Sequence, residues 1–277
     1  MESKTGEALG LMDPTSFKGR VRRALGGYSP VLRWYRLARP TWLWQRVSPY
    51  GKVVRRYIQE YGLEVRHGPF EGLRFPRQAV GRGNGLPTKL LGSYEQELYP
   101  ALEEAAQGDY DVFVEVGSGE GYYCVGFKQR SPATQVIGFE SDPIHRSLSK
   151  RVAKHNDTFV EFGGEATPAV LAGLPPGKLF LMADVEGYEV DLLDVEAVPR
   201  LRETTMLVEL HDRTPEREVT GALIGRFEGS HAITFIEAQP RVQGDWEEMR
   251  DWPVESAHWA LSEGRSRLAR WMLLKPL

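Results

Sequence analysis

From Asp111 to the C-terminus, short apolar segments alternate with segments whose apolar residues recur at helical spacing. This alternation is typical of a parallel sheet, because each parallel crossover needs a connecting helix. Strands are predicted over residues 111–115, 135–140, 158–162, 179–183, 205–210, 232–237 and 269–274. Helices are predicted over residues 94–106, 122–130, 143–155, 189–198 and 215–227. The sequence therefore predicts a Rossmann-like α/β fold, with a mostly parallel sheet of seven strands and helices on both faces.

The part of the chain before this pattern has a different character. Residues 1–88 are interpreted as a basic, Trp-rich accessory segment, and residues 89–277 as one domain built on the sheet. Between Ser16 and Gln59 there are eleven Lys or Arg residues and no acid, although the whole chain has a net charge of -3. The predicted α/β domain must therefore be acidic.

Within the accessory segment, residues 16–60 predict helices that Pro30, Pro40 and Pro49 interrupt. Residues 63–75 predict a small β-hairpin, and the glycines of residues 81–88 predict a flexible connection.

Arginines alternate with aromatic residues in segment 16–60, a composition that suits contact with an anionic membrane surface, an acidic glycan or nucleic acid. The favoured interpretation is a packing layer whose aromatic residues contact the core and whose arginines pair with the acidic domain. Nucleic acid is the least favoured of these partners. A cytoplasmic protein, with peripheral membrane contact as an alternative, is expected because Cys124 is the only cysteine and no long apolar segment occurs. The oligomeric state is not predicted.

A glycine-rich loop follows the first predicted strand and predicts a nucleoside-binding site. Glycines there let the backbone turn sharply and approach a ligand closely. The residues predicted to bind the cofactor are Glu115, Gly117, Ser118, Gly119, Gly121 and Tyr122. A dinucleotide fold would need Gly-x-Gly-x-x-Gly, but Tyr122 breaks that pattern, and Glu120 would oppose a pyrophosphate at the helix start. S-adenosylmethionine is cationic and has no phosphate, so the charges favour it.

Two further acids extend this site. Glu140 ends the second predicted strand, about twenty residues after the loop, where a carboxylate can accept both ribose hydroxyls. Glu165, just past the third strand, is a weaker candidate for contact with the adenine amine.

Three motifs together resemble the FkbM-type methyltransferases: the loop from Glu115 to Tyr123, Asp184-Val-Glu-Gly-Tyr-Glu189, and Val208-Glu-Leu-His211. The similarity covers roughly residues 90–275, and the Asp-Val-Glu-Gly-x-Glu block is its most specific part. That family usually has Asp and Gly-Ala-Asn-x-Gly in the loop, which is a conservative difference. The resemblance implies that residues 89–277 form a methyltransferase domain that usually acts on oxygen, here on a hydroxyl of a saccharide or small natural product.

Acids and a histidine at the ends of the fourth and fifth strands are the catalytic candidates. His211 is the preferred general base because imidazole titrates near neutral pH, with Asp184 and Glu209 beside it. A histidine that only hydrogen-bonds a carboxylate is the structural alternative. Asp184 is also expected to contact the cofactor. A magnesium ion held by Asp184, Glu186, Glu209 and His211 is less expected, because these ligands lack a tight spacing.

Two other functions remain open from the residues alone. An RNA methyltransferase would grip its substrate with residues 16–60. A non-catalytic protein could retain the methyltransferase fold as an interaction module.

Overall fold

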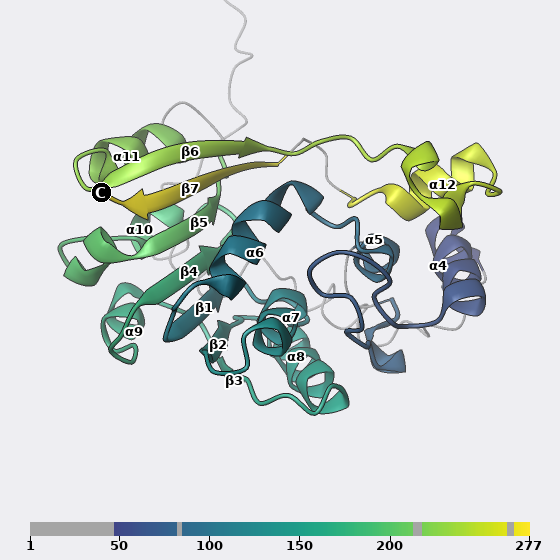
Figure 1. The fold of residues 1–277 in the computed structure, drawn as a ribbon, viewed down its shortest axis with the longest axis horizontal. Coiled ribbons are helices and arrows are strands. Elements are labelled where there is room, and N and C mark those ends of the chain that lie inside the picture. The colour runs from purple at the N-terminus through teal and green to yellow at the C-terminus, as the bar shows by residue number, and fades with distance from the viewer. Residues whose placement is uncertain (1–46, 82–84, 213–217, 265–268) are drawn as a thin grey trace, which may run out of the picture. The chain divides into compact units, whose positions relative to one another are not determined.

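The computed structural model describes residues 47–81, 85–212, 218–264 and 269–277. Its seven strands are β1 (Val112–Val116), β2 (Gln135–Phe139), β3 (Glu161–Gly163), β4 (Leu179–Ala183), β5 (Thr205–Glu209), β6 (His231–Glu237) and β7 (Arg270–Pro276). They form one sheet in the order β3-β2-β1-β4-β5-β7-β6 (Figure 1). The prediction of a mostly parallel, seven-stranded α/β sheet is confirmed.

The strand order places a switch point at the centre of the sheet. β1 to β5 are all parallel, and β1 lies between β2 and β4. From β1 the chain adds β2 and β3 on one side of the sheet, and it then returns to add β4 and β5 on the other side. In sheets of this kind a crevice lies at the carboxyl ends of the two strands where the direction changes, here β1 and β4. β7 pairs antiparallel with both β5 and β6. This antiparallel edge distinguishes the sheet from the parallel order of the dinucleotide fold.

Nine α-helices occur in the described ranges: α4 (Pro49–Tyr61), α5 (Leu86–Leu91), α6 (Tyr99–Gln107), α7 (Tyr122–Arg130), α8 (Pro143–His155), α9 (Pro168–Ala172), α10 (Glu189–Leu192), α11 (Val219–Phe227) and α12 (Val254–Leu261). Short 3₁₀ turns cover Arg77–Ala79, Gln96–Leu98, Pro199–Glu203, Gln243–Asp245 and Glu247–Met249. α4, α8 and α9 begin in the same way, with a capping Ser48, Asp142 or Thr167 directly before a proline. The side-chain oxygen accepts a free N–H of the first turn, and proline needs no partner at that position.

Both faces of the sheet are buried under helices. Along β1 the side chains of Val112, Val114 and Val116 join one apolar cluster, with residues of α9, α10 and α11. Phe113 joins the other cluster, with residues of α6, α7 and α8. All five residues of β1 and of β4 are buried, as expected for central strands of a three-layer fold.

Most predicted elements are present, and the differences have local causes. The helices predicted over 122–130 and 143–155 have these bounds. The helix predicted over 189–198 ends at Leu192, and Pro199 begins a separate 3₁₀ turn. The third strand starts at residue 161, later than predicted. The predicted hairpin contains one antiparallel bridge, Glu64 to Arg74.

Two expectations for the accessory segment are wrong where the structure describes it. Pro49 does not interrupt a helix but begins α4. The connection predicted over 81–88 contains the start of α5, whose six residues are all buried. Pro30, Pro40 and most of segment 16–60 lie outside the described residues.

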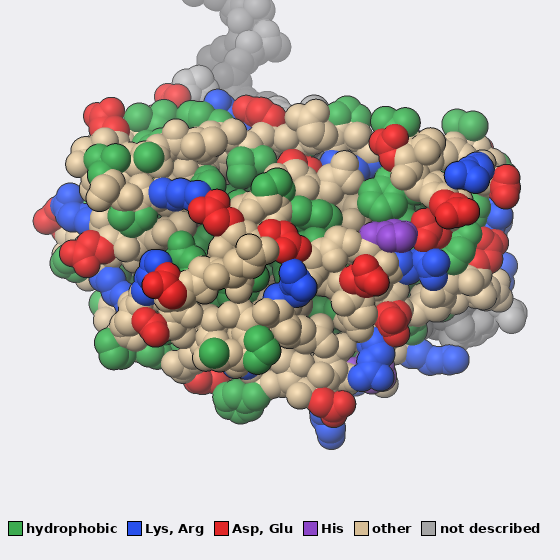
Figure 2. Space-filling view, viewed as in Figure 1, with side chains coloured by type: hydrophobic (Ala, Val, Ile, Leu, Met, Phe, Trp, Pro, Cys, Tyr) green, Lys and Arg blue, Asp and Glu red, His purple; other side chains and the backbone are tan. Residues whose placement is uncertain are grey.

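α4, near the start of the described chain, packs against α12, near its end (Figure 1). The guanidinium carbon of Arg56 lies 4.2 Å from the ring centroid of Trp252, and the Trp252 indole N–H donates to Glu60 at 2.9 Å. A layer of aromatic and charged side chains therefore joins the two segments. The face shown in Figure 2 mixes acidic and basic side chains. No helix in the described ranges is long and apolar enough to cross a membrane.

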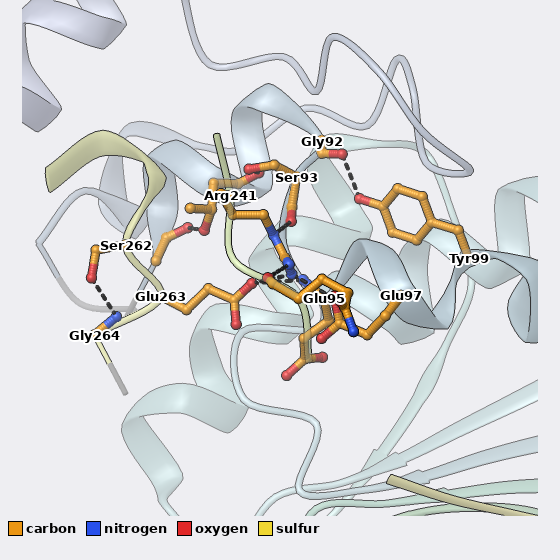
Figure 3. Close-up of polar contacts among 12 residues, drawn as sticks. Gly92, Ser93, Glu95, Glu97, Tyr99, Arg241, Ser262, Glu263 and Gly264 are labelled. Atoms are coloured by element: carbon orange, nitrogen blue, oxygen red, sulfur yellow. Dashed lines mark hydrogen bonds and ion pairs between the residues drawn. The ribbon is translucent and has the colours of Figure 1, made fainter. Parts of the chain in front are cut away.

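A buried ionic cluster fixes the chain before α6 to the segments after β6 and α12 (Figure 3). Arg241 pairs with Glu97 at 2.8 Å and with Glu263 at 2.6 Å, and it donates to the Ser93 carbonyl. The Glu95 N–H also donates to Glu263, at 3.0 Å. Burial raises the pKa of Glu263 to about 7, although the charge of Arg241 opposes this.

Candidate functional site

The glycine loop and the loop after β4 touch at the switch point. The N–H of Asp184 donates to the Val116 carbonyl at 2.9 Å. A Cβ added to Gly117 would lie 3.0 Å from the carbonyl carbon of Asp184 and closer still to its oxygen. Gly117 has φ +91°. Gly117 is therefore required by the neighbouring protein backbone, whatever ligand the loop binds.

Gly119 differs from the other glycines of this loop. Its φ is +51°, and a Cβ added there would meet no atom within 4 Å. A Cβ on Gly121, in contrast, would lie 3.0 Å from the Ser149 side chain, at the packing of α7 on α8. Ser118 is buried between these glycines, and its hydroxyl has no partner among the described residues. Gly119 is thus the part of the loop that leaves space for a ligand.

Glu140 supports that open turn. One carboxylate oxygen accepts the Gly119 N–H at 2.8 Å, and the other accepts the Asp142 N–H at 2.7 Å. Burial raises the pKa of Glu140, and the two backbone N–H groups oppose this. A carboxylate has about four acceptor sites, so two remain for a ligand. Glu165 is exposed after β3, and no interaction with another described residue brings it to the loop.

Two residues predicted to bind the cofactor are buried against the protein. Glu115 accepts the Cys124 N–H at 2.9 Å, so its side chain caps the first turn of α7. Burial raises the pKa of Glu115 to about 8. Tyr122 is 2% exposed and packs edge-on against the rings of Phe70 and Tyr94.

Glu120 has a partner that the sequence did not indicate. It forms a buried ion pair with Lys89 of α5, and the Lys89 ammonium lies 4.4 Å from the centroid of the Tyr94 ring. Burial alone would raise the pKa of Glu120, but the charge of Lys89 outweighs it and lowers the pKa. The argument that Glu120 would repel a pyrophosphate is therefore wrong, because Lys89 neutralises it. Tyr122 in the motif and the antiparallel β7 remain as arguments against a dinucleotide.

The ends of β4 and β5 bring His211 against four acids. Its Nδ1 lies 2.6 Å from Glu189, which is fully buried at the start of α10. Its Nε2 lies 3.7 Å from Asp184, 3.8 Å from Glu186 and 3.8 Å from Glu209. All four residues named as catalytic or metal-binding candidates are thus neighbours. Glu189, which the sequence analysis names only as the last residue of the Asp184–Glu189 motif, is a fifth member.

Crowding of these acids shifts their protonation. Burial raises the pKa of Glu209 to about 10, and the Asp184 charge adds to this. Burial also raises the pKa of Asp184. Burial would lower the pKa of His211, but the hydrogen bond to Glu189 and the charge of Asp184 outweigh it, and the pKa is raised. Burial and crowding therefore favour the protonated forms of Asp184, Glu209 and His211.

The backbone at Glu186, beside His211, has an unusual conformation. Glu186 has φ +54°, one of three left-handed residues other than glycine in the described chain. It lies in the connection between β4, which ends at Ala183, and α10, which begins at Glu189. The left-handed turn is how Glu186 approaches His211. Such strain, of order 1–3 kcal/mol, is concentrated at functional sites.

No family model and no curated protein matches the sequence. Solved structures with a similar fold include precorrin-6y C5,15-methyltransferase from Geobacter metallireducens, at 14% identity over 65% of this chain and 89% of that one, with a TM-score of 0.43. The O-methyltransferase TomG from Streptomyces achromogenes is 12% identical over 82% of this chain and 90% of that one, also with a TM-score of 0.43.

A ribosomal protein L11 methylase from Lactobacillus delbrueckii is 14% identical over 65% of this chain and 77% of that one, with a TM-score of 0.41. Likeness at this level identifies neither the cofactor nor the substrate of this chain. Both have to be argued from its own residues.

Proposed function

We propose that this chain is an S-adenosylmethionine-dependent methyltransferase that acts on a hydroxyl of a saccharide or small natural product. Two observations carry the proposal: the open turn at Gly119, whose N–H donates to Glu140, and the acidic cluster around His211 at the ends of β4 and β5. The backbone at Gly119 is open to a ligand, and Glu140 has acceptor sites left for ribose hydroxyls.

The charges of the site fit this cofactor. Glu140 follows β2 and both Asp184 and Glu186 follow β4, the two strands that flank β1, and Glu120 of the loop is neutralised by Lys89. A pyrophosphate would have to be held near those carboxylates. A sulfonium and an ammonium group are attracted by them.

The cofactor supplies an electrophilic methyl group on sulfur. As the acceptor oxygen forms its bond to that carbon, the carbon–sulfur bond breaks and its electron pair stays on sulfur. The hydroxyl proton has to leave in the same reaction. His211 is the candidate acceptor, because Glu189 holds Nδ1 and leaves Nε2 directed at the cluster. Alignment of the reactants contributes about 7–11 kcal/mol, more than a base that adds a factor of about 10²–10⁴.

Calorimetric titration with S-adenosylhomocysteine tests the cofactor assignment, with NAD as the control. We expect binding of the first compound only. Binding of NAD alone would refute the proposal, and binding of neither would favour a non-catalytic protein. Once binding is established, transfer of a labelled methyl group to a panel of sugars and hydroxylated natural products tests the acceptor class. RNA in the same panel tests the nucleic-acid alternative.

A further inference from the structure

We propose that Asp184, Glu186 and His211 form a binding site for one divalent cation, with Glu209 beside it. The three side chains each offer a ligand atom, and these atoms lie within 4.8 Å of one another. They come from two adjacent strand ends, so the sheet itself brings them together. Only the cation's use in catalysis rests on the function proposed above.

The distances from His211 to the two carboxylates fit three ligands of one ion better than direct hydrogen bonds between the side chains. Asp184 and Glu186 lie 3.7 and 3.8 Å from Nε2 of His211, beyond hydrogen-bond length. Ligands about 2.1 Å from one metal ion are roughly 3.0 Å apart when adjacent and roughly 4.2 Å apart when opposite. Both separations from Nε2 of His211 fall between these limits. All three ligand atoms lie within 4.8 Å of one another, so one cation can lie between them.

His211 is oriented as a metal ligand is. Its Nδ1 hydrogen-bonds to Glu189 at 2.6 Å, and the same oxygen of Glu189 accepts the Gly187 N–H at 2.9 Å. Glu189 is fully buried and cannot turn away. In the neutral tautomer that carries its proton on Nδ1, Nε2 has a lone pair available 3.7 Å from Asp184 and 3.8 Å from Glu186. A histidine that donates its other N–H to a carboxylate is the usual arrangement around a protein-bound metal.

A second observation points to a missing partner. Oδ1 of Asp184, the atom nearest to Nε2, is shielded from solvent and has no hydrogen-bond partner in the described chain. The Asp184 carboxyl group already has a hydrogen bond with Glu209, so Oδ1 is the atom left to bind a cation. Glu186 is brought to the same point by a left-handed backbone.

The types of ligand atom indicate which metal ion the site would prefer. One imidazole and two carboxylates suit a first-row divalent metal such as Mn²⁺ better than Mg²⁺, which prefers oxygen ligands alone. Three protein ligands leave positions open for water or an acceptor hydroxyl. A hydroxyl bound there loses its proton more readily, which would assign the role of His211 to holding the ion rather than acting as the free base.

Titration of the full-length protein with Mn²⁺, followed by the electron paramagnetic resonance signal of the free ion, tests the site. We expect one ion per chain, and at least tenfold weaker binding in Glu186→Gln and in His211→Ala. Glu186 is 79% exposed, so its replacement leaves the packing intact. Asp191→Asn is the control, because it removes an exposed acid from the same helix region and should bind Mn²⁺ normally.

Absence of stoichiometric binding, or equal affinity in all the variants, would overturn the cation site. S-adenosylhomocysteine is titrated into the same samples. Binding of that compound without Mn²⁺ binding would refute the cation site alone. Binding of Mn²⁺ without it would refute the proposed cofactor and leave the cation site standing.

Discussion

Alanine at Gly117 and at Gly119 should separate folding from cofactor binding within one loop. Both glycines have left-handed backbones, which cost an alanine about 1–2 kcal/mol. At Gly117 the new Cβ also collides with the backbone of Asp184, and overpacking of this kind adds about 1–3 kcal/mol. At Gly119 it enters open space, and the lower entropy of the unfolded chain returns about 0.4–1 kcal/mol.

Gly117→Ala should therefore lose about 3 kcal/mol of unfolding free energy and Gly119→Ala about 1 kcal/mol or less. For a folded unit of this size, the first loss lowers Tm by roughly 6–12 °C and the second by roughly 2–4 °C. Thermal unfolding followed by circular dichroism measures both. Calorimetry with S-adenosylhomocysteine should then show at least tenfold weaker binding in folded Gly119→Ala. Equal Tm values would refute the collision at Gly117, and unchanged affinity of Gly119→Ala would refute the ligand space.

Three other changes have definite outcomes. Burial raises the pKa of Glu115 to about 8, so the folded protein favours the neutral form of this side chain. The free energy of unfolding should therefore be highest near pH 4.5 and fall by up to about 5 kcal/mol as the pH rises through 8. Denaturant titrations should show no such fall for Glu115→Gln. Lys89→Met leaves Glu120 buried without its partner and should cost about 3–5 kcal/mol, with much of the loss recovered in the double variant that also carries Glu120→Gln. His211→Ala should bind S-adenosylhomocysteine normally but lose about 10²–10⁴ in turnover, and an unchanged rate would exclude it from the reaction.

The fold was largely predictable because its signal is local. Each central strand is an apolar run buried on both faces, as the all-buried β1 and β4 show. Helices whose ends have strong signals, such as Asp142-Pro143 before α8, were predicted to the residue. α5 was missed because its six residues are too few to show helical periodicity, and glycines surround it. The glycines around α5 favour a loop, but packing of this segment against α12 and α4 stabilises the helix.

The sequence predicted which residues form the site, but not which side chain contacts which. Parallel strands end at one edge, so Asp184, Glu209 and His211 had to be neighbours once the strands were known. Which acid would meet which nitrogen depends on backbone turns that no spacing rule gives. The left-handed Glu186 carries its carboxylate toward Nε2, while Glu189, three residues later, reaches Nδ1.

The Lys89–Glu120 pair shows the limit most clearly. Thirty-one residues separate the two side chains, and α5 had been interpreted as a connection, so nothing in the sequence indicated that the loop acid was neutralised. That pairing changes the electrostatic argument about the cofactor. The preference for the cationic cofactor that we propose therefore rests on Glu140 and the acids around His211, not on the loop itself. Removing the charge of Glu186 should therefore affect ligand choice more than removing that of Glu120, which mainly holds α5 against α7.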